Sequence, residues 1–91
     1  MTSPAVLVFV MQGCGACSEY MPRFNRAVRP FHQRGLPVHI IDVNADKRSV
    51  AFADRLKIKS TPTTIVMGRS GAVRREGAIT DNEIKKILEQ A

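Results

Sequence analysis

An apolar run that leads directly into a pair of cysteines constrains the fold of this chain more than any other feature. Residues 5–11 read Ala-Val-Leu-Val-Phe-Val-Met, with no alternation of polar and apolar side chains. Such a run predicts a strand buried on both faces, as in the parallel centre of an α/β sheet. After two further residues come Cys14 and Cys17, the only cysteines of the chain. A strand followed by C-x-x-C at the start of a helix is typical of a redox site.

The residues after the cysteines show a helical pattern. Apolar side chains recur three and four positions apart, which predicts an amphipathic helix: they are Met21, Phe24, Val28 and Phe31. Proline removes a backbone donor and clashes with the preceding turn. We therefore expect a kink near Pro22 and a break near Pro30. Gly35 is the predicted end of this helical stretch.

A second strand and a second helix follow. Residues 38–43 are mostly apolar and β-branched, which predicts a strand. We expect this strand to be parallel to the first, because a helix-length crossover connects the two. Residues 44–46 provide capping side chains for a short helix over 50–56.

The last third of the chain predicts a hairpin and a final helix. Residues 63–67 form a β-branched strand pattern, and the turn residues 68–71 lead to a charged partner strand at 72–76 that suits a sheet edge. Thr80 and Glu83 have the spacing of a capping box, in which each group satisfies a backbone donor of the other. A helix is expected from this point onward.

These elements predict one α/β domain over residues 1–91, in the order β-α-β-α-β-β-α. A mixed four-stranded sheet flanked by helices is the expected architecture. A chain of 91 residues has room for a single small core and a shallow site.

Charge and hydropathy limit the classes of partner. The chain has 14 Lys and Arg against 8 Asp and Glu, a formal net charge of +6, which favours acidic protein surfaces. The basic residues are scattered without interleaved aromatics, so nucleic acid is not an expected partner. The run 5–11 is too short to span a membrane and has no basic residue before it. We therefore expect no membrane association and a cytoplasmic location, where paired cysteines are more often catalytic or metal-binding than structural.

The two cysteines have distinct expected roles. The thiolate is the attacking species, and a helix N-terminus favours the anion, so Cys14 is the predicted nucleophile. Cys17 is three residues along the same helix face, within reach of a disulfide, and is the predicted resolving thiol. Gly15 and Ala16 keep the intervening turn small. Glu19, one turn on, would partly oppose thiolate formation if it faced the sulfurs.

Three separated features resemble the thioredoxin superfamily over nearly the whole chain: the Cys14 to Cys17 motif, Pro22 in the following helix, and Thr61-Pro62 before the third strand. The chain resembles a small thioredoxin/glutaredoxin-like protein. The resemblance implies a minimal thioredoxin-like fold and a thiol-disulfide oxidoreductase that reduces protein disulfides. It also implies a cis peptide bond at Pro62, which faces the dithiol.

The resemblance also implies a substrate surface around the dithiol. Thr61 would offer backbone N–H and C=O groups to an extended substrate strand. Two small residues after the hairpin either leave room for the same substrate or simply form a turn. The expected substrate-binding residues are Gly13, Gly15, Ala16, Thr61, Pro62, Gly77 and Ala78.

Several positions depart from thioredoxin. Gln12 and Gly13 replace an acidic residue and a tryptophan, and Ala16 replaces the proline between the cysteines. Val8 and Ile40 stand where thioredoxin has a buried aspartate and a buried lysine, which help to move the proton of the second cysteine. We expect a less rigid turn and a less reducing couple than that of thioredoxin.

Two other functions remain open from the sequence. One is a glutathione-dependent, glutaredoxin-like reductase, and the other is a non-catalytic binding or scaffold module with a basic surface. A zinc site is disfavoured, although two cysteines with His32 and His39 satisfy the ligand count. No metal and no cofactor is expected beyond a redox-active disulfide between Cys14 and Cys17. The expected partners of the monomer are disulfide-containing proteins and an electron donor, either a thioredoxin-reductase-like flavoprotein or glutathione.

Overall fold

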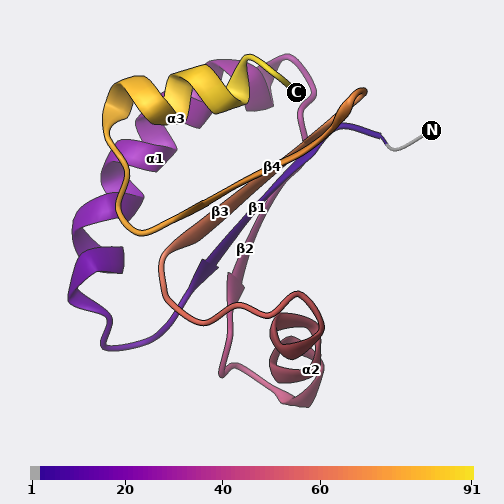
Figure 1. Cartoon of the computed structure of the whole chain (residues 1–91). Coiled ribbons are helices and arrows are strands. Elements are labelled where there is room, and N and C mark those ends of the chain that lie inside the picture. The colour runs from indigo at the N-terminus through magenta and orange to yellow at the C-terminus, as the bar shows by residue number, and fades with distance from the viewer. Residues whose placement is uncertain (1–2) are drawn as a thin grey trace.

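Four strands and three helices alternate along residues 3–91, the part of the chain that the computed structural model describes (Figure 1). In chain order they are β1 (Ala5–Val10), α1 (Gly15–Gln33), β2 (Val38–Asp42), α2 (Lys47–Arg55), β3 (Thr63–Gly68), β4 (Gly71–Glu76) and α3 (Asp81–Leu88). The predicted α/β class and the order β-α-β-α-β-β-α are confirmed.

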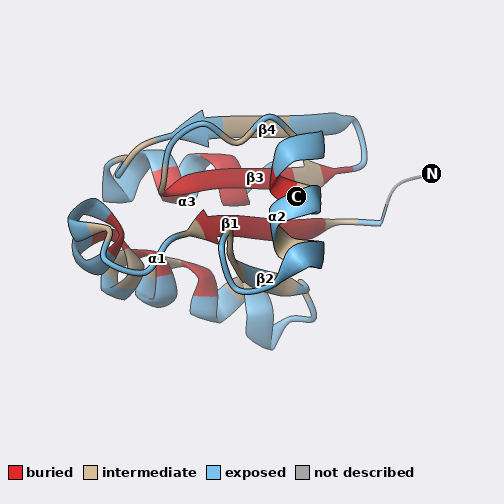
Figure 2. Cartoon of the chain, turned by 90° about the horizontal axis from the view of Figure 1, so that it is seen from below, coloured by how far each residue is buried: buried red, intermediate tan, exposed pale blue. Residues whose placement is uncertain are grey.

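The strands form one mixed sheet in the order β2-β1-β3-β4. β1 pairs with β2 in parallel, as predicted, and with β3 in antiparallel, while β3 and β4 form the predicted hairpin. β1 and β3 are the two inner strands and are mostly buried, whereas β2 and β4 are the more exposed edges (Figure 2).

Helices cover both faces of the sheet. α1 and α3 lie on one face and α2 lies on the other (Figure 1). The side chains of β1 alternate between two cores: Val6 and Val8 pack with residues of α1 and α3, while Leu7 and Phe9 pack with Ala53 of α2. The expectation that this strand is buried on both faces is confirmed.

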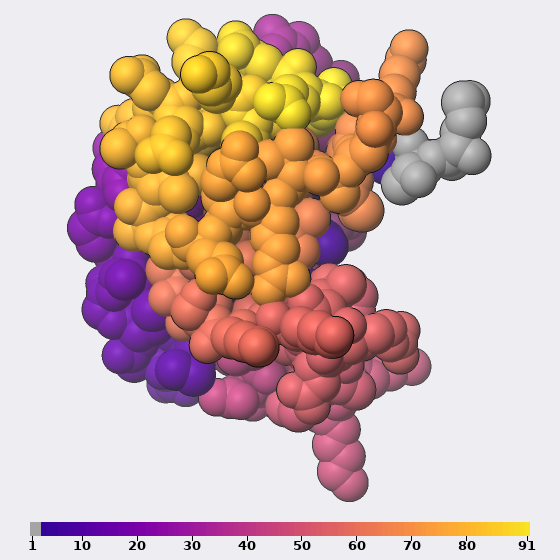
Figure 3. Space-filling view, viewed as in Figure 1, coloured from indigo at the N-terminus to yellow at the C-terminus, as the bar shows by residue number. Residues whose placement is uncertain are grey.

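Local sequence signals set the helix boundaries. The Asp46 side chain accepts a hydrogen bond from a backbone N–H in the first turn of α2. Thr80 and Glu83 form the predicted capping box at the start of α3. The last turn of α1 is followed by Gly35, whose φ of 105° lies in the left-handed region that favours glycine. α3 then packs over the hairpin, and its atoms lie against those of β4 (Figure 3).

The predicted break at Pro30 is wrong, because α1 continues to Gln33 with Pro30 inside it. Val28 and Phe31 belong to the core that α1 shares with the sheet, which holds the final turns in place. Pro30 itself is exposed, so its ring is accommodated on the solvent side, where helices curve outward most easily. The carbonyl of Pro30 also accepts a hydrogen bond from the Arg34 N–H at 3.3 Å.

One polar pair lies inside the core between α1 and β3. The Tyr20 hydroxyl and the Thr64 Oγ1 are 2.8 Å apart, and both residues are fully buried. Burial raises the pKa of Tyr20, and its hydrogen bond to Thr64 partly opposes that rise. Among residues 3–91, no buried side-chain nitrogen or oxygen lacks a hydrogen-bond partner. Each of the two buried hydroxyls is therefore the hydrogen-bond partner of the other.

We predict that Tyr20→Phe lowers the free energy of unfolding by about 1–3 kcal/mol, because it leaves the Thr64 hydroxyl buried without a partner. Adding Thr64→Val removes the orphaned hydroxyl, so the double variant should be more stable than Tyr20→Phe alone. Urea denaturation of the oxidised proteins measures both differences. A double variant no more stable than the single one would contradict the interdependence of the two groups.

Candidate functional site

Cys14 and Cys17 are joined by a disulfide at the start of α1. Their Cα atoms are 5.2 Å apart, within the usual range for such a bond. Cys14 is half-buried and lies at the helix cap, whereas Cys17 is only 5% exposed and lies one turn deeper. The arrangement therefore has an accessible outer sulfur and a shielded inner sulfur.

The helix terminus gives Cys14 an electropositive surrounding. Cys14 is the N-cap of α1, and its Sγ accepts a hydrogen bond from the Cys17 backbone N–H at 3.1 Å. The first turn of α1 contains no acidic residue. Unpaired N–H groups and the positive end of the helix dipole both stabilise an anion at this position. On reduction, the site favours the thiolate of Cys14.

Thr61 contacts the same sulfur from the loop before β3. Its hydroxyl donates a hydrogen bond to the Cys14 Sγ at 3.3 Å. Its carbonyl oxygen lies 3.4 Å from that sulfur, which has no proton in the disulfide and can donate one only as a thiol. The Thr61–Pro62 peptide bond is cis in the structure. The sequence indicated a role for the backbone of Thr61, but it gave no indication of the hydroxyl.

The other predicted substrate-binding residues fall into two groups. Pro62 is fully buried, and its carbonyl accepts a hydrogen bond from the Gly77 N–H at 2.8 Å, so the turn with the exposed Ala78 lies beside it. The second group flanks Cys14 and is exposed: it comprises Gly13, Gly15 and Ala16. The structure thus brings the loop after β4 together with the loop before β3, which itself contacts Cys14.

A cation that the sequence analysis did not single out holds this second loop in place. Arg23 of α1 donates from Nη1 to the Ile79 carbonyl and to the Asp81 carboxylate, both at 2.8 Å. Its Nε and Nη2 donate to the Glu19 carboxylate, both at 2.9 Å. The i,i+4 spacing of Glu19 and Arg23 was visible in the sequence, but the link to the loop after β4 was not.

The contacts of Arg23 also explain why Glu19, which follows the cysteines on α1, does not act as an isolated negative charge. Its carboxylate forms an ion pair with Arg23. This hydrogen-bonded pairing lowers the pKa of Glu19 and raises that of Arg23. The positive charge of Arg23 therefore offsets the negative charge of Glu19.

The two positions that carry buried charges in thioredoxin are adjacent here. Val8 and Ile40 are partners in the β1–β2 register. Val8 is fully buried, whereas Ile40 is 53% exposed at the sheet edge. The interior next to Val8 instead contains the hydroxyl of Thr64, its register partner on β3. No carboxylate or ammonium group therefore comes from these two positions.

The histidines lie away from the dithiol chemistry. His32 is near the far end of α1, where its Nδ1 is 2.9 Å from the Leu36 carbonyl oxygen. His39 is exposed on β2. Within residues 3–91, no three His, Cys, Asp or Glu side chains are grouped in a way that could hold a metal ion. The zinc arrangement of these histidines with the two cysteines is therefore not formed.

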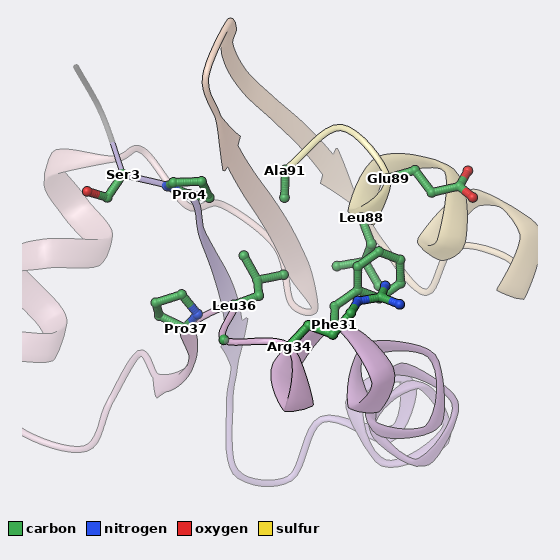
Figure 4. Close-up of a pocket in the computed structure, with 10 residues that line it drawn as sticks. Ser3, Pro4, Phe31, Arg34, Leu36, Pro37, Leu88, Glu89 and Ala91 are labelled. Atoms are coloured by element: carbon green, nitrogen blue, oxygen red, sulfur yellow. The ribbon is translucent and has the colours of Figure 1, made fainter.

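A hollow of about 550 Å³ lies at the other end of α1 from the dithiol (Figure 4). Phe31 and Leu36 line it, together with Leu88 of α3. None of the predicted site residues contributes to it.

In the part of the chain that is described, no helix combines the length and apolarity needed to cross a membrane.

The fold places a C-x-x-C disulfide at the N-terminus of α1, which is the arrangement of a thioredoxin-like domain. Over residues 2–91 the sequence matches the family described as thioredoxin-like domain. Because this match spans nearly the whole sequence, the chain belongs to that family.

Curated relatives and solved structures agree with this assignment. Protein disulfide-isomerase A4 of Homo sapiens is 27% identical over 79 residues, and its Bos taurus counterpart is 25% identical over the same length. These matches cover 87% of this chain but only 12% of either relative. The chain thus corresponds to a small part of each of these proteins.

Two solved thioredoxin structures show that this chain is similar to thioredoxins in its fold. Chloroplastic thioredoxin z has a TM-score of 0.77 at 22% identity, covering 97% of this chain and 77% of its own. Oxidised mitochondrial thioredoxin 3 from Saccharomyces cerevisiae has a TM-score of 0.79 at 17% identity, covering 97% and 78%. The expected minimal thioredoxin-like fold is therefore confirmed.

We predict that Thr61→Val raises the pKa of the Cys14 thiol by about 1 unit. The substitution removes a hydrogen bond to the anion worth roughly 1.5 kcal/mol, and about 1.4 kcal/mol corresponds to one unit. Ultraviolet absorbance of the thiolate, followed against pH in the reduced protein, measures the shift.

Ser18→Ala is the matched control, because the Ser18 hydroxyl contacts the Cys14 carbonyl at 3.4 Å and not the sulfur. Its titration should coincide with that of the unmodified protein. Equal titrations for Thr61→Val and the unmodified protein would show that the Thr61 hydroxyl does not stabilise the thiolate.

Proposed function

We propose that this protein reduces disulfides in other proteins by dithiol exchange, with Cys14 as nucleophile and Cys17 as resolving thiol. The proposal rests on a difference between the two cysteines in exposure and in hydrogen bonding. The Cys14 sulfur is the more accessible one and accepts hydrogen bonds from a helix N–H and from the Thr61 hydroxyl. The Cys17 sulfur is shielded beneath it.

The exchange proceeds in two steps. The Cys14 thiolate attacks one sulfur of the substrate disulfide, forming a mixed disulfide and releasing the other substrate sulfur as a thiolate, which takes up a proton. Cys17 loses its proton and attacks the Cys14 sulfur, which frees the second substrate thiol and leaves the Cys14–Cys17 disulfide. The substrate gains two electrons and two protons, and the protein is oxidised by the same amount.

The loops beside the dithiol suit an extended substrate. Backbone N–H and C=O groups of Thr61 would pair with the substrate strand next to its disulfide. The turn at Gly77 and Ala78 would border that strand, and the buried Pro62 would support this wall from beneath. Exposed small residues around the outer sulfur leave room for its approach: Gly13, Gly15 and Ala16.

An external donor must return the disulfide to the dithiol. We propose a thioredoxin-reductase-like flavoprotein for this step, in a cytoplasmic setting and with the protein acting as a monomer. The chain needs no bound cofactor for the exchange, because the electrons are carried by the two sulfurs. A glutathione-dependent reductase remains the alternative enzyme, and a scaffold with a basic surface remains the non-catalytic alternative.

Single cysteine variants test the proposal. Cys14→Ser should abolish reduction of insulin disulfides, since no nucleophile remains at the accessible position. Cys17→Ser should retain the first step and accumulate mixed disulfides through Cys14, visible by mass spectrometry and released by dithiothreitol. Ser18→Ala, next to the motif, should reduce insulin at the unmodified rate.

The results separate the alternatives. Insulin reduction that survives Cys14→Ser would contradict the assigned nucleophile, and an unmodified protein without reductase activity would favour the scaffold. Turnover supported by thioredoxin reductase and NADPH would support the proposed donor. Turnover supported only by glutathione and glutathione reductase would replace it with the glutaredoxin-like alternative.

A further inference from the structure

Among residues 3–91, the edge of the sheet at β2 presents backbone groups without a partner. Two hydrogen bonds fix which way the strand faces: the Val6 N–H donates to the Pro37 carbonyl, and the Val43 N–H donates to the Val10 carbonyl, both at 2.9 Å. In a parallel ladder, alternate residues face the neighbouring strand. The backbone groups of Val38 and Ile40 therefore point away from β1, out of the sheet.

This edge lacks the protection that the opposite edge has. β4 ends in a charged sequence that includes Arg74 and Arg75, and charged side chains keep other strands from pairing with an edge. In the middle of β2, Ile40 is 53% exposed. It is more exposed than Val50 on α2, at 40%. β2 is thus an open strand at the edge of the sheet (Figure 2), and the aliphatic side chain of Ile40 is exposed at its centre.

A groove runs between this edge and the second half of α1. Its volume is about 400 Å³, and its floor is formed by Val28, Val38 and Ile40. Arg29 and His32 stand at its side, and no carboxylate of the described part of the chain lines it. Among residues 3–91, Arg29 forms no ion pair with an acidic side chain. The groove thus combines an apolar floor with an available positive charge.

We propose that the β2 edge binds an extended acidic segment of a partner protein as a fifth strand of the sheet. The unpaired backbone groups of β2 require an extended occupant. On the face toward α1, side chains of that segment lie two positions apart. One aliphatic side chain fills the groove over Val28 and Ile40, and a carboxylate two positions away pairs with Arg29.

The charge of the chain argues against a second copy at this edge. Pairing two β2 strands around a twofold axis would bring the same surface of each copy together, including Arg29 on both α1 helices. Each copy has a formal net charge of +6. An acidic segment from a different protein meets no such repulsion.

The edge is separate from the dithiol. Arg29 lies about 22 Å along α1 from Cys14, at 1.5 Å per residue. A partner strand seated on β2 therefore leaves the Cys14 sulfur accessible. The binding surface is suited to hold the protein on a partner while the dithiol acts elsewhere on it.

The test uses capped pentapeptides and NMR of the isotopically labelled protein. Glu-Thr-Val-Thr-Glu places valine and both glutamates on one face of a strand. Lys-Thr-Val-Thr-Lys reverses the charge, and Glu-Val-Thr-Thr-Glu keeps the composition but moves valine to the other face. We expect the first peptide to shift the amides of Val38 and Ile40 and to bind about tenfold more tightly than either control.

Matched variants locate the contact. Ile40→Glu should weaken binding of Glu-Thr-Val-Thr-Glu about tenfold, because it removes the apolar floor and places a carboxylate against the glutamates of the peptide. Arg29→Glu should weaken it about fivefold. Val50→Glu makes the same change in net charge at an exposed apolar position on α2, and it should leave the affinity unchanged.

Three outcomes would overturn the proposal. The first is the absence of amide shifts at β2 up to millimolar peptide. The second is equal binding of all three peptides. The third is self-association of the unmodified protein through this edge in sedimentation equilibrium, abolished by Ile40→Lys, which would assign the edge to a second copy.

Discussion

The burial of β1 on both faces is the constraint on which the rest of the structure depends. An unbroken apolar strand cannot remain in water on either side, so α1 and α3 must cover one face and α2 the other. β2 and β3 then pair on its two edges. The end of this central strand is therefore the point at which the chain must turn into α1, and that turn carries Cys14.

The same strand brings Thr61 to the sulfur. β3 runs antiparallel to β1, and Thr63 at its start is the register partner of Phe9 near the end of β1. The residues just before β3 thus lie beside the residues just after β1. Two segments 47 positions apart in sequence meet in the contact between the Thr61 hydroxyl and the Cys14 sulfur. The hydrogen bond from Thr61 to the Cys14 sulfur therefore depends on the antiparallel pairing of β1 and β3.

Signals confined to a few neighbouring residues could be read from the sequence. The uninterrupted apolar pattern predicted β1, and the Thr80 and Glu83 spacing predicted the capping box that the structure contains. The break at Pro30 was predicted wrongly, because tertiary packing of the end of α1 outweighs the local preference of proline.

Contacts between distant segments could not be read in the same way. Arg23 bonds to the Ile79 carbonyl across 56 positions and to Asp81 across 58. Neither separation has a periodicity that a sequence pattern could reveal. The family resemblance indicated that the Thr61–Pro62 loop and the Gly77 turn belong to the site, but the hydroxyl and guanidinium groups that fix their positions emerge only from the fold.

The helix N-terminus and Thr61 together make Cys14 the more reactive sulfur of the pair. The most direct measurement is the rate of iodoacetamide alkylation of the reduced protein against pH, with the modified cysteine identified by peptide mass spectrometry. We predict that Cys14 is alkylated first and that its rate is half-maximal below pH ~8.5, the ordinary pKa of a free cysteine. Alkylation of Cys17 first, or a midpoint at or above that value, would contradict it.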